Sequence, residues 1–166
     1  MIPDSILSKV VKPARYTGGE WNMVAKDWEG AEVKVALAYP DVYDIGMSNL
    51  GISILYDILN RQSGVLAERV YAPWVDLDAE MRQAHLPLGA IEYRRPVGDC
   101  DIVGFSIGYE LAYTNVLNML HLAQIPERAA ERTDAHPLVI AGCYCALNTE
   151  PMADFIDLFV LGDGED

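Results

Sequence analysis

The residues of this sequence that could bind or transform a ligand are concentrated in short, glycine-rich segments. Each of these segments follows an apolar run, and their principal members are Asp41, Tyr43, Gly46, Ser106, Gly108, Gly142 and Cys143. A carboxylate, a phenol, a hydroxyl and a thiol can hydrogen-bond or coordinate a ligand, and glycine lets a large flat or extended ligand approach the backbone. Glycine after a strand is also ordinary turn chemistry, so a single segment favours neither interpretation. A further segment of this kind, GDGED, occupies residues 162–166.

No other group of residues has the spacing of a known catalytic or metal site. Cys143 and Cys145 supply only two thiolates, which do not complete a tetrahedral metal site. The three histidines stand at unrelated positions, and there is no G-x-S-x-G turn for a serine nucleophile. No lysine follows a glycine loop in the manner of a phosphate-binding loop, and the strand end GFSIG lacks the dinucleotide fingerprint. We therefore predict no catalytic residue and no metal site in this chain.

The pattern of apolar residues predicts strands that alternate with helices. The strands are expected at Glu32–Tyr39, Val65–Tyr71, Asp101–Ser106, Pro137–Ala141 and Asp157–Leu161. The helices are expected at about Met47–Asn60, Leu77–Ala84, Glu110–Leu122 and Pro151–Phe155. Strands that are apolar throughout, rather than at every second position, indicate a parallel sheet covered on both faces. Right-handed connections then bring the glycine-rich segments to one edge of the sheet, where such folds bind ligands.

The first part of the chain has a different character. Residues 1–31 are punctuated by proline and glycine and are expected to form an irregular N-terminal arm. Trp21 and Trp28 are the expected points at which this arm docks. Residues 32–166 are expected to form a single α/β domain, a size consistent with the length of 166 residues.

Composition and charge narrow the class of protein. Hydrophobic residues make up 51% of the chain, which is enough for a core and argues against a disordered chain. There is no apolar run of membrane-spanning length and no signal peptide, and three cysteines cannot all pair. We expect a cytoplasmic protein with reduced thiols. The net charge is −13, and all four lysines lie within the first 34 residues, so we expect neither nucleic acid nor membrane as a partner.

The segments after the first, third and fourth expected strands resemble those of cobalamin-binding domains. Asp41-Val42-Tyr43-Asp44-Ile45-Gly46 is similar to the D-x-H-x-x-G signature of those domains, with tyrosine in the position of the histidine. Ser106-Ile107-Gly108 falls where they carry S-x-L, and Gly142-Cys143 falls where they carry paired glycines. Three partial matches in the correct order are far more specific than any one of them.

The whole chain, from about Val11 to Glu165, resembles the N-terminal part of a family of cobalamin-domain/radical S-adenosylmethionine (radical SAM) proteins. The likeness is carried by KPARYTGGEWN, YPDVYDIGMSNLGISILYDILN, ERVYAPW, DIVGFSIGYELAYTNVLNML and EPMADFIDLFVLGDGE. It implies a three-layer, flavodoxin-like (Rossmann-like) fold with five parallel strands in the order 2-1-3-4-5. It also implies that a catalytic radical SAM barrel follows in the full-length protein and is this domain's partner.

The resemblance implies cobalamin as the cofactor, held at the seven residues named at the outset. In the family the histidine coordinates cobalt from below, and the corrinoid's displaced nucleotide tail passes the serine and the glycines. A neutral phenol with a pKa of about 10 is a poor cobalt ligand, so Tyr43 argues for a corrinoid without a histidine ligand. Cys143 and Tyr144 add bulk where the tail would pass. A 4Fe-4S cluster and S-adenosylmethionine belong to the following domain only, because Cys100, Cys143 and Cys145 lack the C-x3-C-x2-C spacing.

Three functions are therefore open at this point. The leading hypothesis is a module that holds a base-off corrinoid, or retains a degenerate corrinoid site, for a radical SAM enzyme that moves a methyl group or performs another radical reaction. The second is a ligand-free scaffold domain that docks onto the barrel. The third is a flavin or nucleotide site on the same scaffold. In none of them does this chain catalyse a reaction alone.

Overall fold

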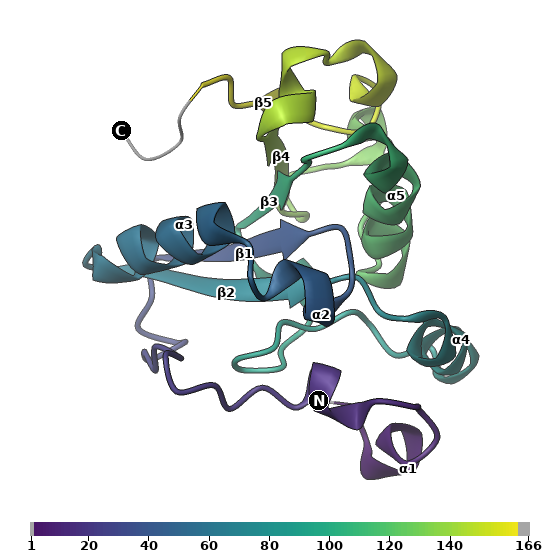
Figure 1. Cartoon of the computed structure of the whole chain (residues 1–166). Helices are drawn as coiled ribbons and strands as arrows, with labels where there is room; N and C mark the ends of the chain where they lie inside the picture. The colour runs from purple at the N-terminus through teal and green to yellow at the C-terminus, as the bar shows by residue number, and fades with distance from the viewer. Residues whose placement is uncertain (1, 163–166) are drawn as a thin grey trace.

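The computed structural model describes residues 2–162 and shows a parallel sheet between two unequal layers of helices (Figure 1). The five strands are β1 (Val33–Tyr39), β2 (Val65–Tyr71), β3 (Ile102–Ser106), β4 (Leu138–Gly142) and β5 (Leu158–Phe159). Their order is β2-β1-β3-β4-β5, and every neighbouring pair is parallel. This confirms the predicted flavodoxin-like architecture and places the reversal of strand order between β1 and β3.

The helices begin and end where local sequence signals act. The α3 helix (Leu50–Arg61) starts after Asn49, whose side chain accepts a hydrogen bond from the backbone N–H of Ile52 at 3.0 Å. Such a cap satisfies one of the free N–H groups of the first turn, and it explains why the helix starts later than the predicted Met47. The remaining α-helices are α1 (Asp4–Leu7), α2 (Tyr43–Gly46), α4 (Val75–Ala84) and α5 (Tyr113–Leu122).

Some predicted elements are shorter or more irregular in the structure. The helix expected from Glu110 begins as a 3-10 turn over Glu110–Ala112 and becomes α-helical only at Tyr113. The helix expected near Pro151–Phe155 is a 3-10 turn over Glu150–Met152. The last strand pairs over Leu158–Phe159 only. These differences lie at ends of elements, where propensity and periodicity carry the least information.

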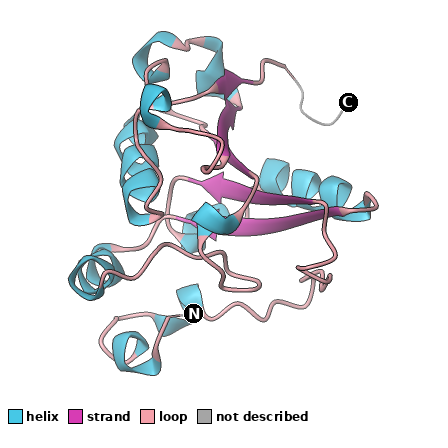
Figure 2. Ribbon diagram, turned by 180° about the vertical axis from the view of Figure 1, so that it is seen from behind, coloured by secondary structure: helices cyan, strands magenta, loops and turns pink. Residues whose placement is uncertain are grey.

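The two faces of the sheet have separate cores. On one face, α3 packs over β1 and β2 around Val35, Leu37, Ile52, Tyr56 and Ala67. On the other face, α4 and α5 pack over the sheet around a larger core whose centre includes Val70, Val103, Phe105, Val116 and Val139. Figure 2 shows the same division from behind, with α3 on one side of the strands and α4 and α5 on the other.

The N-terminal arm runs along the outer side of β2. The amino group of Lys26 donates to the carbonyl of Val65 at 2.6 Å, and the backbone N–H of Val24 donates to the hydroxyl of Tyr56 at 2.9 Å. Trp28 is buried, as predicted, but Trp21 is fully exposed, so the prediction that Trp21 docks the arm is wrong. Trp21 extends from a turn that lies beyond the core, and hydrophobicity alone did not reveal this.

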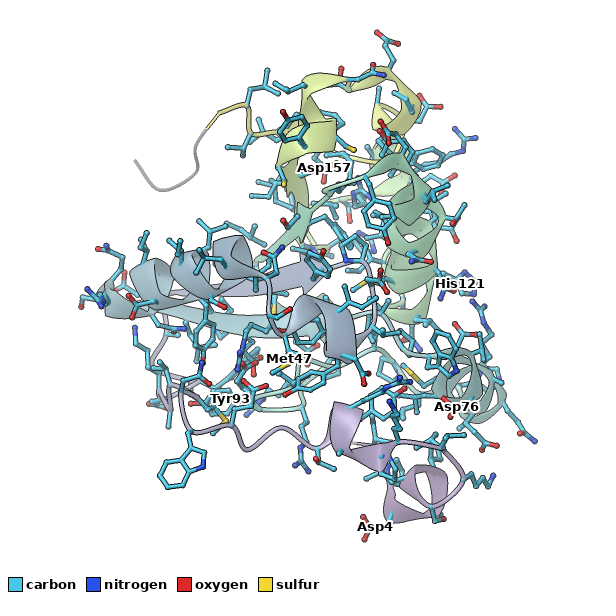
Figure 3. The ribbon with its side chains drawn as sticks, in the orientation of Figure 1. Asp4, Met47, Asp76, Tyr93, His121 and Asp157 are labelled. Carbon is cyan, nitrogen blue, oxygen red and sulfur yellow. The ribbon has the colours of Figure 1, made fainter. Side chains whose placement is uncertain are left out.

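The free edge of β2 is covered by the segment that follows α4. The backbone N–H of Ile91 donates to the carbonyl of Arg69 at 2.9 Å, and the N–H of Tyr93 donates to Glu68 at 2.6 Å. The hydroxyl of Tyr93 in turn bonds to the backbone of Lys26, and Figure 3 shows Tyr93 between the sheet and the arm. Covering an edge strand in this way removes a site for unwanted strand pairing.

Candidate functional site at the carboxyl edge of the sheet

The loops that follow β1, β3 and β4 meet at one edge of the sheet, as predicted. The hydroxyl of Tyr109, after β3, donates to Asp41 Oδ2, after β1, at 2.6 Å. The backbone N–H of Cys145, after β4, donates to the carbonyl of Ile107 at 3.0 Å. The side-chain amide of Asn115 donates to the carbonyl of Pro40 at 2.9 Å. Each loop is therefore bonded to the next across the point at which the strand order reverses.

Asp41 has both carboxylate oxygens occupied by donors. Its Oδ1 accepts from the backbone N–H of Val42 at 2.7 Å, and its Oδ2 accepts from Tyr109. The bond to the ionised carboxylate stabilises the neutral phenol, which raises the pKa of Tyr109 to about 12. Asp41 thus fastens the first loop to the second, and the sequence offered no sign of Tyr109 as its partner.

Tyr43 does not join the other predicted site residues. Its hydroxyl donates to Glu20 of the arm, and its ring meets that of Tyr71 edge to face, with centroids 5.4 Å apart. The bond to Glu20 and burial raise the pKa of Tyr43 to about 12. Because Tyr71 ends β2, the phenol is directed to the outer side of β1, away from the loops after β3 and β4.

Gly46 is required by packing beneath these aromatic rings. A Cβ atom at this position would lie 2.5 Å from the ring of Tyr71 and 2.8 Å from the ring of Tyr39. Contacts that short do not occur between real side chains, so any other residue would displace α2. The close approach of α2 to two tyrosines therefore accounts for this glycine without a ligand.

A buried ionic cluster that the sequence analysis missed lies beneath Tyr43. Arg69 on β2 is 3% exposed and holds Glu92 at 2.7 Å and Glu20 of the arm at 2.5 Å. Its guanidinium also lies 4.7 Å from the centroid of the Tyr56 ring on α3. Charges buried to this degree are stable only when paired. The signal was present in the sequence, because Glu68 and Arg69 interrupt the otherwise apolar strand VLAERVY.

Ser106, Gly108 and Gly142 line the open part of this edge. Ser106 is paired in register with Gly142, so both face the side of the sheet that carries α3. A Cβ atom on Gly142 would meet only atoms of Val160, at 3.8 and 3.9 Å, and one on Gly108 would meet nothing within 4 Å. The structure therefore brings these three residues together beside free space. Of the segment 162–166, only Gly162 lies within the described residues.

Cys143 has a backbone conformation that normally requires glycine. Its φ of 77° and ψ of −169° lie in a region that residues with a Cβ atom avoid. Its side chain is exposed, whereas Cys145 is half-buried beside Tyr113, and burial raises the pKa of Cys145. Within residues 2–162, no three histidine, cysteine or carboxylate side chains gather closely enough to hold a metal ion. His121, for example, lies on the far side of α5 from the sheet edge (Figure 3).

Large apolar side chains surround this edge and remain exposed. They are Ile45, Met47, Leu50, Leu111, Tyr144, Leu147 and Leu161. We call this set the apolar rim. Leu111 is 84% exposed and Tyr144 is 80% exposed. Several residues of the apolar rim are exposed although their loops are held by hydrogen bonds to neighbouring loops. A cluster of exposed apolar residues marks a surface that binds a ligand or a protein.

A small cavity lies elsewhere, under the N-terminal arm. It has a volume of about 60 Å³ and is lined mainly by apolar residues, among them Tyr16, Tyr71, Leu77, Met81 and Ile91. Arg15 and Arg94 also border it, but Arg15 is paired with Asp44 and Arg94 donates to the carbonyl of Thr17. The cavity adjoins the carboxyl end of β2, which Tyr71 ends, and no residue of the loops after β3 and β4 lines it.

Comparisons with known proteins identify the family of the chain. In the described part of the chain, no helix is both long enough and apolar enough to traverse a membrane. No curated protein sequence matches the chain significantly. The family model described as "Radical SAM proteins, N-terminal" matches residues 51–166, which is well over half of the chain. The matched part contains all of α3 except its first residue, the strands β2 to β5 and the glycine-lined loops after β3 and β4. Because the match extends over more than half of the chain, the chain belongs to the N-terminal domain family of radical SAM proteins.

Proposed function

We propose that this domain holds a base-off corrinoid at the carboxyl edge of its sheet. In the full-length protein, a radical SAM domain that carries a 4Fe-4S cluster and S-adenosylmethionine would follow it and act on the bound corrinoid. One observation carries the proposal above the others: the strip of glycine and serine that opens on the α3 side of β3 and β4. A bound corrinoid supplies a cobalt centre that can carry a methyl group.

The strip has a chemistry that suits an extended polar tail. Gly104, Ser106 and Gly142 face the same side, and none of them places more than a hydroxyl on the sheet surface. The Ser106 hydroxyl can donate to or accept from a ligand, and the glycines leave backbone within reach. The apolar rim would then lie against the less polar parts of the macrocycle.

The tail-binding part of the site fits a corrinoid, but the residue at the lower-ligand position does not. Tyr43 is bonded to Glu20 and packed on Tyr71, so its phenol is held away from the strip. The corrinoid would therefore bind without a ligand from Tyr43. Tyr43→Phe should lower stability by about 1 kcal/mol through the lost bond to Glu20 and leave retention of a corrinoid unchanged.

The direct test is to incubate the protein with hydroxocobalamin, separate it by gel filtration and record its visible spectrum. We expect corrin absorbance to elute with the protein. Gly142→Leu should abolish that absorbance, because the added side chain fills the strip. Ala130→Leu, which adds a comparable bulk in an exposed turn before β4, is the matched control and should retain the corrinoid. A colourless wild-type protein at high concentration would contradict the proposal.

A second candidate function is a ligand-free scaffold that docks the radical SAM domain. The bond between Tyr109 and Asp41 favours it, because this bond closes the space between the loops after β1 and β3. The apolar rim would then be a protein interface. If the domain is a scaffold, the wild-type protein never binds hydroxocobalamin, and Leu111→Asp and Leu147→Asp should disrupt its association with the radical SAM domain. This combination of results separates the two functions. Yellow colour or nucleotide absorbance after purification would instead indicate a flavin or nucleotide site.

A further inference from the structure

Glu68 on β2 is a buried carboxyl group without a cation. It is 1% exposed, and its Oε1 accepts from the backbone N–H of Tyr93 at 2.6 Å. Its Oε2 is also buried and has no hydrogen-bond partner among residues 2–162. Arg69, the next residue, projects to the opposite face of the strand and already pairs with Glu92 and Glu20. A carboxylate buried without a cation is costly, so the folded chain favours the protonated form of Glu68.

The groups that face Glu68 also favour the proton. After α4, the carboxylate of Glu92 repels a charge on Glu68, and only the exposed Arg95 attracts it. Before β3, the thiol of Cys100 is buried and neutral, because burial raises its pKa to about 12. On β1, the residue in register with Glu68 is the uncharged Ala36. Burial and the charge of Glu92 together raise the pKa of Glu68 to about 7.

The segment that encloses Glu68 is a loop rather than a part of the sheet. We call residues 89–95 the edge segment. Besides its bond to Glu68, the edge segment is held to β2 by the N–H of Ile91, which donates to a strand carbonyl at 2.9 Å. It is closed on itself by the N–H of Ala90, which donates to the carbonyl of Arg95 at 3.1 Å. The edge segment can therefore leave β2 as a unit while the strands stay paired with one another.

The N-terminal arm rests on the edge segment. The hydroxyl of Tyr93 bonds to both the N–H and the carbonyl of Lys26, and Figure 3 shows Tyr93 between the sheet and the arm. The guanidinium of Arg94 donates to the carbonyl of Thr17. Docking of the arm therefore depends on the position of the edge segment.

We infer that a proton on Glu68 holds the edge segment and the N-terminal arm against β2, and that loss of this proton at rising pH opens both. An ionised Glu68 gains hydration when water reaches it. Opening the edge segment admits water and breaks few bonds, whereas opening the sheet breaks many, so the opening is local. The inference requires neither a corrinoid nor the proposed function.

The arm connects this proton to the candidate functional site. Glu20 of the arm accepts from the hydroxyl of Tyr43 on α2. Asp44, also on α2, pairs with Lys12 of the arm at 3.1 Å and with Arg15. Because α2 belongs to the loop after β1, an arm that opens withdraws contacts from the first loop of the carboxyl edge.

Amide hydrogen exchange, followed by NMR in ¹⁵N-labelled protein at pH 5.5 and pH 8.5, tests this inference. Each rate is divided by the intrinsic rate at the same pH, so that only protection by structure is compared. We expect the protection factors of the Ile91, Tyr93 and Lys26 amides to fall together on the order of thirtyfold at the higher pH. This factor follows from a Glu68 pKa of 4.5 when open and about 7 when closed. Equal protection at the two pH values would overturn the inference.

An amide in the middle of the sheet distinguishes local from global opening. The amide of Val103 on β3 should exchange only when the whole domain unfolds. We expect Val103 to be more strongly protected than Ile91, Tyr93 and Lys26 at both pH values. Identical protection of all four amides would mean that they open only by global unfolding, and it would overturn the inference.

Substitution of Glu68 assigns the effect to its proton. Glu68→Gln keeps an acceptor for the N–H of Tyr93 but has no proton to lose, so the edge segment and the arm should stay protected equally at both pH values. Glu131→Gln, at an exposed acid in a turn, is the matched control and should keep the wild-type response. Glu68→Met, which is also uncharged, replaces Glu68→Gln if that variant does not fold. A wild-type response in either Glu68 variant would overturn the inference.

Discussion

The hydroxyl of Tyr109 donates to Asp41 Oδ2 at 2.6 Å and thereby joins the loops that follow β1 and β3. These two strands are neighbours at the reversal of strand order, where ligands of such sheets bind. A single side-chain bond therefore controls the space between two loops that the sequence places 68 residues apart.

Tyr109→Phe should loosen this connection without disturbing the core. Tyr109 is 38% exposed, so we expect the free energy of unfolding to fall by only about 0.5–1 kcal/mol, measured by denaturant titration. Removing the bond should also speed the uptake of hydroxocobalamin followed by stopped-flow absorbance. Tyr144→Phe, at an exposed tyrosine, is the control for the stability measurement. Unchanged stability in Tyr109→Phe would show that the bond is not formed in solution.

Cys143→Gly should stabilise the domain. The backbone of Cys143 lies in a region that suits only glycine, and holding another residue there costs about 1–3 kcal/mol of strain. Glycine relieves this strain, but it loses more conformational entropy on folding, which offsets about 0.5–1 kcal/mol of the gain. We expect a net gain of about 1 kcal/mol in the free energy of unfolding. Cys143→Ala removes the thiol but keeps the Cβ atom, so it should give no such gain. Equal stability of the two variants would contradict the strain.

Arg69→Met should be among the most destabilising substitutions in the chain. It leaves Glu92, whose side chain is 1% exposed, without its cation, and breaking a buried ion pair in this way costs about 3–5 kcal/mol. The additional change Glu92→Gln should recover part of the loss. Thermal or denaturant unfolding of Arg69→Met, of Glu92→Gln and of the double variant measures the coupling. Arg61→Met is the control, because its pair with Asp57 is exposed and contributes less than about 1 kcal/mol. A similar loss of stability in Arg69→Met and Arg61→Met would show that burial does not strengthen the Arg69 ion pair.

Glu68→Gln should change how stability depends on pH. Burial raises the pKa of Glu68 from its ordinary value of 4.5 to about 7, and the charge of Glu92 adds to the effect, while the N–H of Tyr93 and the charge of Arg95 oppose it. Between these two values the folded chain keeps a proton that the unfolded chain has lost, so rising pH lowers the free energy of unfolding in this window.

Replacing the carboxyl group of Glu68 with an amide removes this fall in the free energy of unfolding with rising pH. Relative to the wild type, Glu68→Gln should gain on the order of 1–3 kcal/mol between pH 5 and pH 8, measured by denaturant unfolding at each pH. Glu131→Gln, at an exposed acid in a turn, should show no comparable gain. A constant difference between wild type and Glu68→Gln across this range would show that Glu68 is ionised throughout.

Part of the candidate site could be predicted from the sequence because it depends on backbone rules. Parallel strands with right-handed connections must bring their following loops to one edge, so Asp41, Ser106, Gly108 and Gly142 were predicted together and lie together. The direction of Tyr43 could not be predicted, since it depends on Glu20, 23 residues earlier in the arm, and on a ring at the end of β2. The paired roles of Arg69 and Glu92 required the same knowledge of which distant segments meet.

The sequence by itself determined the α/β class, the alternation of strands and helices and the edge at which the glycine-lined loops gather. Apolar periodicity and chain connectivity are local properties, and they suffice for these features. Only the tertiary structure decided that Tyr43 faces the arm and that Cys143 has a glycine-like backbone. Each of these depends on packing between residues far apart in the chain, and such contacts produce no periodic pattern in the sequence.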